Sequence, residues 1–109
     1  MKYHNKKVII DGIKFDSIKE SKRYRELKIL ERAGLIRELK LQPAFTLIPS
    51  FKKNGKTYRK ASYIADFQYY DVDKKQIVIE DTKGYKTEVY KLKKKLFEYK
   101  YSDLEIKEL

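Results

Sequence analysis

The feature that most constrains the fold is a short apolar run that has to be covered on two sides. Residues 76–83 are typical of a strand, and Ile77–Ile79 within it are apolar without interruption. Consecutive residues of a strand point to opposite faces of the sheet, so both faces of this strand must be buried. The chain therefore needs a central strand with cover on both faces, and 109 residues can supply it within one domain.

Two segments with helical spacing can supply this cover. In the first, Ser17 stands three residues before Glu20, which is the spacing of a capping box, and Gly34 is placed to end the helix. In the second, Thr87 can cap the first turn. The stripe of the second helix that we expect to be buried consists of Val89, Leu92, Leu96 and Tyr99.

Three strand-like segments lie between the two helices, and one follows the second helix. They are residues 37–48 with a break near Pro43, 57–70, 76–83 and 103–109. The first three are most economically an antiparallel meander, and the last should run parallel to its predecessor after a right-handed crossover. We therefore predict an α/β chain of the α+β type, with a mixed four-stranded sheet flanked by helices in the order αβββαβ.

Two dipeptides mark tight turns between strands. Asp11-Gly12 predicts an N-terminal hairpin, residues 1–15, that extends a core of residues 16–109 within a single domain. Asn54-Gly55 predicts a second hairpin within residues 50–60, which is basic and which we expect to contact DNA.

The charge balance indicates a polyanionic partner. The chain has 27 Lys and Arg residues against 16 Asp and Glu residues, a formal net charge of +11. Nucleic acid suits this excess, because cationic side chains release the counterions condensed on it. The residues expected to contact DNA are Lys52, Lys53, Lys56, Arg59, Lys60, Lys86 and Lys94. The alternative is a lysine-rich surface without such a partner.

Composition excludes several kinds of site. The chain has no cysteine and a single histidine, His4, which excludes disulfides, thiolate nucleophiles, zinc ribbons, iron–sulfur clusters and His-rich metal sites. Residues 83–87 lack the glycine pattern of a phosphate-binding loop, and we expect no nucleotide or organic cofactor. No apolar run approaches the roughly 18 residues of a membrane span, so we expect a cytoplasmic protein with no membrane partner.

Two acidic residues stand where the strands are otherwise apolar. Asp66 follows Ala65, and Asp81 shares a strand face with Ile79. A symmetric hairpin across the turn at residues 71–75 would set the two aspartates opposite each other, about 4.5–5.5 Å apart. Carboxylates at this separation repel each other. A divalent cation such as Mg²⁺, which prefers carboxylate and water oxygens, would compensate the repulsion.

A third carboxylate and a lysine are placed to join this pair. Glu20 lies on the helix face that points toward the sheet, although the capping box gives it a competing role. Lys83 shares the strand face of Asp81, and one Mg²⁺ ion would neutralise the net charge of the cluster. The alternatives are an exposed edge aspartate at Asp66 and a surface ion pair at Lys83. Glu80 points to the opposite face, where we expect a structural or supporting role.

These residues resemble the signature of a known superfamily. Asp66, followed by Asp81-Thr82-Lys83, resembles the split D…(D/E)-x-K motif of PD-(D/E)XK nucleases, and the predicted element order resembles their restriction-endonuclease-like core. The chain is most similar to small phage and prophage proteins of this superfamily, over nearly its whole length. The segments that carry this similarity are Phe15-Asp16-Ser17, Ala33-Gly34-Leu35-Ile36, Leu41-Gln42-Pro43, Tyr63-Ile64-Ala65-Asp66-Phe67 and Glu80-Asp81-Thr82-Lys83-Gly84. Ala65 departs from the proline of the superfamily motif.

The resemblance implies a Mg²⁺-dependent endodeoxyribonuclease in which Mn²⁺ can substitute. The implied catalytic residues are Glu20, Asp66, Asp81 and Lys83, and the implied metal ligands are Asp66, Asp81, Glu20 and the backbone carbonyl of Thr82. Lys83 would orient the attacking water or stabilise charge on the phosphate. The implied supporting residues are Gln42, Glu80 and Lys91, the last expected to face the sheet from the second helix.

The resemblance also implies a setting, a bacterial host cell in which a phage or prophage encodes the protein. DNA would be the partner, in recombination, replication or repair, and linear, nicked, flap and branched or junction substrates all stay open. We expect a homodimer if the protein makes branched or double-strand cuts. One alternative is a non-catalytic, basic DNA-binding accessory protein that retains the nuclease fold. A structural or protein-interaction domain is another, which would leave the charge and the acidic residues unexplained.

Overall fold

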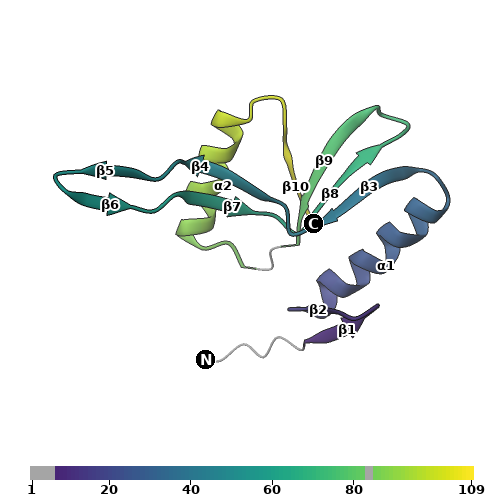
Figure 1. Cartoon of the computed structure of the whole chain (residues 1–109). Helices are drawn as coiled ribbons and strands as arrows, with labels where there is room; N and C mark the ends of the chain where they lie inside the picture. Colours follow the sequence, from purple (N-terminus) through teal and green to yellow (C-terminus); the bar gives the residue numbers. More distant parts are fainter. Residues whose placement is uncertain (1–6, 83–84) are drawn as a thin grey trace.

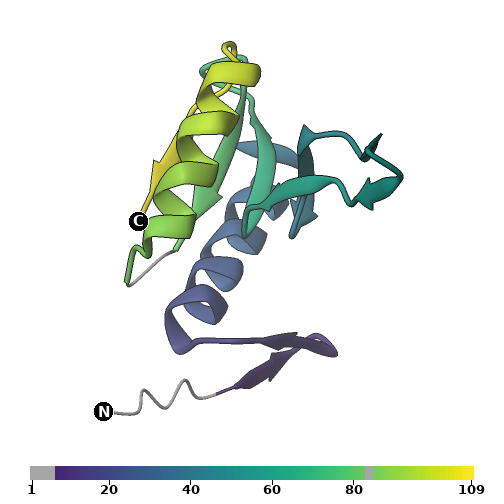
Figure 2. The same cartoon turned by 90° about the vertical axis from the view of Figure 1, so that its left-hand side faces the viewer.

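The computed structural model describes residues 7–82 and 85–109. In chain order the elements are β1 (Val8–Ile10), β2 (Ile13–Phe15), α1 (Ile18–Arg32), β3 (Ile36–Leu41), β4 (Ala44–Ile48), β5 (Phe51–Lys53), β6 (Lys56–Tyr58), β7 (Ala61–Ile64), β8 (Phe67–Asp71), β9 (Gln76–Asp81), α2 (Glu88–Lys100) and β10 (Ile106–Glu108). The predicted α+β class is confirmed: a mixed four-stranded sheet in the order β10-β9-β8-β3 lies with the two helices (Figures 1 and 2).

The strand directions of this sheet are those that the sequence predicts. β3 is antiparallel to β8, β8 is antiparallel to β9, and β10 is parallel to β9. The β8–β9 register runs symmetrically from the pair Asp71 and Gln76 to the pair Phe67 and Glu80. The register ends there: Asp81 is the last residue of β9, and Asp66 lies just outside β8, with its N–H donating to the Glu80 carbonyl at 3.1 Å.

Two hydrophobic clusters cover the two faces of the sheet. The cluster beneath α1 consists of Phe15, Tyr24, Leu27, Ile36, Phe67 and Tyr69. The cluster beneath α2 consists of Leu47, Tyr63, Ala65, Ile79, Tyr90, Phe97 and Ile106. Ile79 belongs to the α2 cluster, whereas its neighbour Val78 packs against the α1 cluster. The central strand β9 is therefore covered on both faces, as its apolar run requires.

Both predicted tight hairpins are present. Asp11 and Gly12 have φ angles of 53° and 75°, and Asn54 and Gly55 have φ angles of 52° and 74°. Two successive residues in the left-handed region are what the preferred two-residue hairpin turn demands. The first turn joins β1 to β2, which ends at Phe15 in the α1 cluster, and the second joins β5 to β6.

The predicted long strand 57–70 is wrong in one respect, because the structure divides it into β6, β7 and β8. Tyr63, before the break between β7 and β8, belongs to the α2 cluster, whereas Phe67, after this break, belongs to the α1 cluster. Regular alternation would keep these two odd-numbered residues on one face. The chain therefore rotates at Asp66, which lies in the break.

A break between β3 and β4 lies beside the break at Asp66. The predicted interruption near Pro43 is confirmed, since β3 ends at Leu41 and β4 begins at Ala44. Gln42 has a φ of 50°, and its N–H donates to the Asp66 carbonyl at 2.9 Å. The two neighbouring segments thus bend together, and β4 and β7 lead away from the four-stranded sheet (Figure 1).

The predicted helix ends are confirmed, but only part of the predicted buried face of α2 is buried. The hydroxyls of Ser17 and Thr87 cap α1 and α2 by accepting from backbone N–H groups three residues later. Of the predicted stripe in α2, Leu96 packs against the α2 cluster, whereas the exposed fractions of Val89, Leu92 and Tyr99 are 63%, 55% and 87%. The buried residues are Tyr90 and Phe97, so the helix is rotated to place its aromatic rings against β4 and β7.

No helix among residues 7–82 and 85–109 is long and apolar enough to cross a membrane.

Candidate functional site

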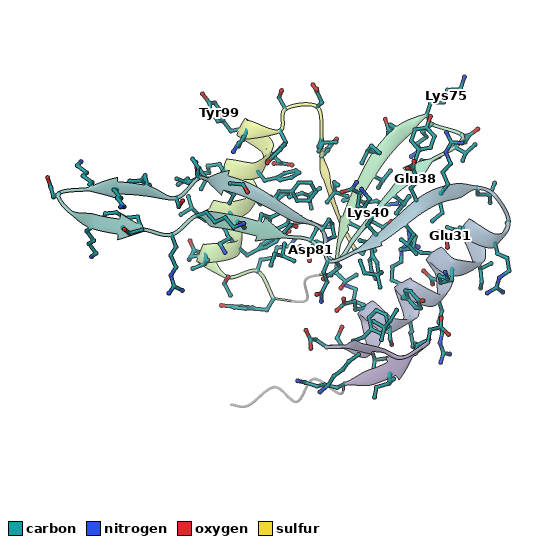
Figure 3. All side chains as sticks on the ribbon, viewed as in Figure 1. Glu31, Glu38, Lys40, Lys75, Asp81 and Tyr99 are labelled. Atoms are coloured by element: carbon teal, nitrogen blue, oxygen red, sulfur yellow. The ribbon has the colours of Figure 1, made fainter. Side chains whose placement is uncertain are left out.

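The two aspartates singled out from the sequence lie where the bent strands meet the four-stranded sheet. Asp81 is the last residue of β9 and is fully buried, and Asp66 is partly buried in the break between β7 and β8. Figure 3 labels Asp81 at this junction. Asp81 faces α2, because its carboxylate accepts a hydrogen bond from Tyr63 of the α2 cluster, whereas Asp66 lies in the break beyond the last β8–β9 pair, Phe67 and Glu80. The N–H of Asp66 donates to the Glu80 carbonyl at 3.1 Å, which places Asp66 beside the end of β9.

Thr82 holds the carboxylate of Asp66. Asp66 Oδ2 accepts a hydrogen bond from the Thr82 N–H and another from the Thr82 hydroxyl, both at 2.7 Å. The Thr82 nitrogen belongs to the peptide bond that follows Asp81, so the Asp66 carboxylate lies against the backbone next to Asp81. The sequence suggested only the Thr82 carbonyl for this site, and it missed the hydroxyl and the N–H.

Tyr63 connects the two aspartates from the α2 side. Its buried hydroxyl donates a hydrogen bond to Asp81 Oδ2. Burial and this hydrogen bond raise the pKa of Tyr63 well above its ordinary value, and the negative charges of Asp81 and Asp66 raise it further. One phenol therefore lies within electrostatic reach of both carboxylates and stays protonated as a donor. The sequence analysis missed this role, because a tyrosine in an apolar strand has the pattern of a core residue.

A further carboxylate that the sequence analysis missed, Glu108, lies beside Asp81 in the parallel β9–β10 register. Glu108 accepts a hydrogen bond from the Tyr90 hydroxyl at 2.7 Å, and its other oxygen lies 3.3 Å from Lys86 Nζ and 3.4 Å from Lys94 Nζ. The Tyr90 hydrogen bond, followed by those of the two lysines, lowers the pKa of Glu108. The predicted parallel strand was the signal that could have found it.

Glu80 lies on the opposite face from the aspartates, as expected, and ties the sheet to α1. Its carboxylate is fully buried and accepts from Arg23 Nε at 2.7 Å and from Arg23 Nη2 at 2.6 Å. The Tyr69 hydroxyl also donates to it. The hydrogen bond to Glu80 is the main reason that the pKa of Arg23 is raised. These contacts fit the structural role expected for Glu80.

Glu20 does not form a three-carboxylate cluster with the aspartates. It is buried in the first turn of α1, and its N–H donates to the Ser17 hydroxyl at 3.1 Å, which is one half of the predicted capping box. Within the part of the chain that the structure describes, no group of three or more acidic or histidine side chains is arranged to hold a metal ion. The physical reason is the fold itself, because α1 covers the face that carries Glu80, whereas the Asp81 carboxylate faces Tyr63 on the α2 side.

The remaining predicted residues fall into four groups. Lys83 lies outside the described residues. Lys91 is exposed and pairs with Glu88 at 3.2 Å, so the prediction that it faces the sheet is wrong, again because α2 is rotated. Gln42 supports the bend through its backbone N–H. The basic residues of the hairpin, Lys52, Lys53, Lys56, Arg59 and Lys60, are all exposed.

Comparison with known proteins gives one match. A family model described as "Protein of unknown function (DUF1064)" matches residues 1–108. No curated protein and no solved structure matches the chain.

Proposed function

We propose that this chain, which belongs to the DUF1064 family, is a Mg²⁺-dependent endodeoxyribonuclease with a restriction-endonuclease-like αβββαβ core. The observation that carries the proposal is that the Asp66 carboxylate accepts two hydrogen bonds from Thr82, the residue after Asp81, in a chain of net charge +11. A protein that only bound DNA would gain nothing from two carboxylates held together, because they repel phosphate.

The donor set of this pair fits a hard divalent cation. Mg²⁺ is usually held by one or two carboxylates together with waters and substrate phosphates, so the two aspartates suffice without a third carboxylate. Mn²⁺ takes the same oxygen ligands. When bound, the ion would neutralise charge on the scissile phosphate and lower the pKa of a bound water.

Two neighbouring side chains hold the aspartates in place. Thr82 fixes the Asp66 carboxylate through two hydrogen bonds, and the Tyr63 hydroxyl donates to Asp81. These hydrogen bonds orient the two carboxylates, and Tyr63 acts as a positioning residue.

Two lysines near Asp66 and Asp81 reduce the electrostatic repulsion between the aspartate carboxylates and a phosphate group. Lys86 and Lys94 hold Glu108, whose backbone lies next to Asp81 in the parallel register. Their positive charges offset the Glu108 carboxylate close to the site. By the resemblance, Lys83 would orient the attacking water.

The second candidate function is a non-catalytic DNA-binding accessory protein that retains this fold. The observation in its favour is that both aspartates accept hydrogen bonds from protein groups and that the described residues hold no three-carboxylate group. The two functions differ in their need for a metal ion, since only the nuclease requires one.

A cleavage assay tests the proposal. Linear, nicked, flap and four-way-junction DNAs are incubated with the protein and Mg²⁺ or Mn²⁺, and Asp66→Asn and Asp81→Asn are compared with the matched control Glu26→Gln. Glu26 is exposed, lies in α1 and pairs with Arg23 at 2.9 Å. We expect the aspartate variants to lose about 100-fold or more in cleavage rate while the control retains it. Undiminished cleavage by Asp66→Asn, which is only partly buried, would overturn the site assignment.

A further inference from the structure

The β5–β6 hairpin is an isolated ribbon that projects from the end of the β4–β7 ladder (Figures 1 and 2). Among the described strands, β5 pairs only with β6, and every residue of both is exposed. A two-stranded ribbon alone is at best marginally stable in water. The hairpin therefore contributes little to the core, and its role has to lie in what it presents to the solvent.

The hairpin presents positive charge that the protein does not compensate. Residues 50–60 contain five Lys and Arg residues and no acidic residue. Lys53 and Lys56 stand directly opposite each other across the two strands, an arrangement that is destabilising by itself. None of the ion pairs between described residues involves a lysine of this hairpin. Such an arrangement is favourable beside a polyanion, where each lysine can neutralise a phosphate.

Specific features keep the ribbon formed despite this repulsion. Phe51 and Tyr58 are cross-strand partners whose rings stack 4.8 Å apart at an angle of 10°. Aromatic cross-strand pairs stabilise a ribbon by roughly 0.2–1 kcal/mol. Lys56 Nζ lies 5.2 Å from the centre of the Tyr58 ring, which also holds that lysine in place. A formed two-stranded ribbon has the dimensions that the major groove of duplex DNA admits.

The β4–β7 ladder fixes the hairpin at a distance from the aspartates. Its register runs from the pair Ala44 and Ile64, next to the bend, to the pair Ile48 and Ala61, next to the hairpin. Tyr58 stands eight residues before Asp66 in the chain. At about 3.3 Å per residue, this separation is up to about 26 Å. At 3.4 Å per base pair, about 26 Å of duplex is roughly 8 base pairs, and the tip of the hairpin reaches a few base pairs further.

We propose that the β5–β6 hairpin is an arm that binds duplex DNA up to about 8–11 base pairs from the site of cleavage. The substrate then has to carry duplex of up to about this length on one side of the cut, whatever structure lies at the cut itself. The inference rests on the proposed function and narrows its substrate class, because it requires a duplex flank and excludes wholly single-stranded DNA.

Duplexes with a flank shortened stepwise on either side of the cut test this inference. Binding is measured by fluorescence anisotropy in EDTA, and cleavage is measured with Mn²⁺. The arm variant Lys53→Gln/Lys56→Gln is compared with the charge-matched control Lys74→Gln/Lys75→Asn, at the β8–β9 turn far from the arm (Figure 3). Lys75 has a φ of 56°, which asparagine tolerates.

We expect the wild type and the control to lose affinity and cleavage when one flank falls below about 8 base pairs. The arm variant should bind long duplexes more weakly and respond little to flank length. Loss of two phosphate contacts reduces the salt slope by about 1.8, so between 50 and 200 mM salt the arm variant should lose about 12-fold less affinity than the wild type.

The outcomes separate the two proposals. Cleavage that is independent of flank length, with the arm variant binding like the control, would overturn the arm and leave the nuclease standing. Length-dependent binding that requires the arm lysines, without cleavage of any DNA, would overturn the nuclease and support the arm. Equal binding of single strands and duplexes of the same length would refute the duplex requirement.

Discussion

Replacing Tyr63 by phenylalanine removes one hydroxyl from the candidate site and leaves the packing of the ring unchanged. The lost interaction is a hydrogen bond to the buried carboxylate of Asp81. Hydrogen bonds to charged groups contribute about 1.5–3 kcal/mol, and phenylalanine leaves almost no cavity. We therefore expect Tyr63→Phe to lower the free energy of unfolding by about 2 kcal/mol, or the melting temperature by about 10 °C.

Urea unfolding followed by far-ultraviolet circular dichroism measures this loss. Tyr99→Phe is the matched control, because the exposed fraction of Tyr99 is 87% and its substitution should change stability by no more than about 0.5 kcal/mol. The Tyr63 variant should also cleave DNA more slowly at equal folded fraction, since Asp81 loses the group that orients it. A stability change no larger than that of the control would refute the reasoning.

Two further predictions concern the other polar groups of the sheet. Arg23→Met should destabilise the protein by about 3–5 kcal/mol in urea unfolding, because it removes the bidentate partner of the buried Glu80 carboxylate. A loss as small as that from Lys28→Met, which breaks a partly exposed pair on α1, would contradict this expectation. Alkaline unfolding should depend on the buried tyrosines. The pKa values of Tyr63, Tyr69 and Tyr90 are all raised in the folded state, mainly by burial. These tyrosines contribute fully to the free energy of unfolding below the pKa of an unfolded tyrosine, about 10. Above this pH their contribution decreases by up to about 1.4 kcal/mol per pH unit for each titrating group. Tyr69→Phe should make the decline above pH 10 less steep, and an unchanged slope would refute this.

The sequence predicts those parts of the fold that local chemistry decides. The Asp11-Gly12 and Asn54-Gly55 turns and the Ser17 cap are encoded within a few residues, and the structure has all of them. The symmetric turn after Asp71 also sets the β8–β9 register as far as Phe67 and Glu80, which brings Asp66 and Asp81 to the same end of the sheet.

The features that the sequence analysis missed depend on contacts between distant residues. The break at Asp66 is held by its hydrogen bonds with Gln42 and Glu80 from other strands. The rotation of α2 follows from the packing of Phe97 and from the contact between Tyr90 and Glu108. Neither contact is visible in the periodicity of the helix, which favoured the wrong face.

Only part of the candidate site was predictable from the sequence. Acidic residues in apolar strands identified the aspartate pair, because burial of a carboxylate needs a reason. Tyr63 and Thr82, which hold the pair, have the pattern of ordinary strand residues. Glu20 is buried in the first turn of α1, as helical periodicity predicts, but periodicity does not give which side of the sheet the helix covers.

The most direct test of the account is the binding of Mn²⁺, measured by electron paramagnetic resonance with and without a duplex. The wild type and Glu26→Gln should bind the ion at one shared site, and Asp66→Asn and Asp81→Asn should each lose that binding while remaining folded by circular dichroism. Equal Mn²⁺ binding by the wild type and both folded aspartate variants would contradict the claim that these two carboxylates hold one metal ion together.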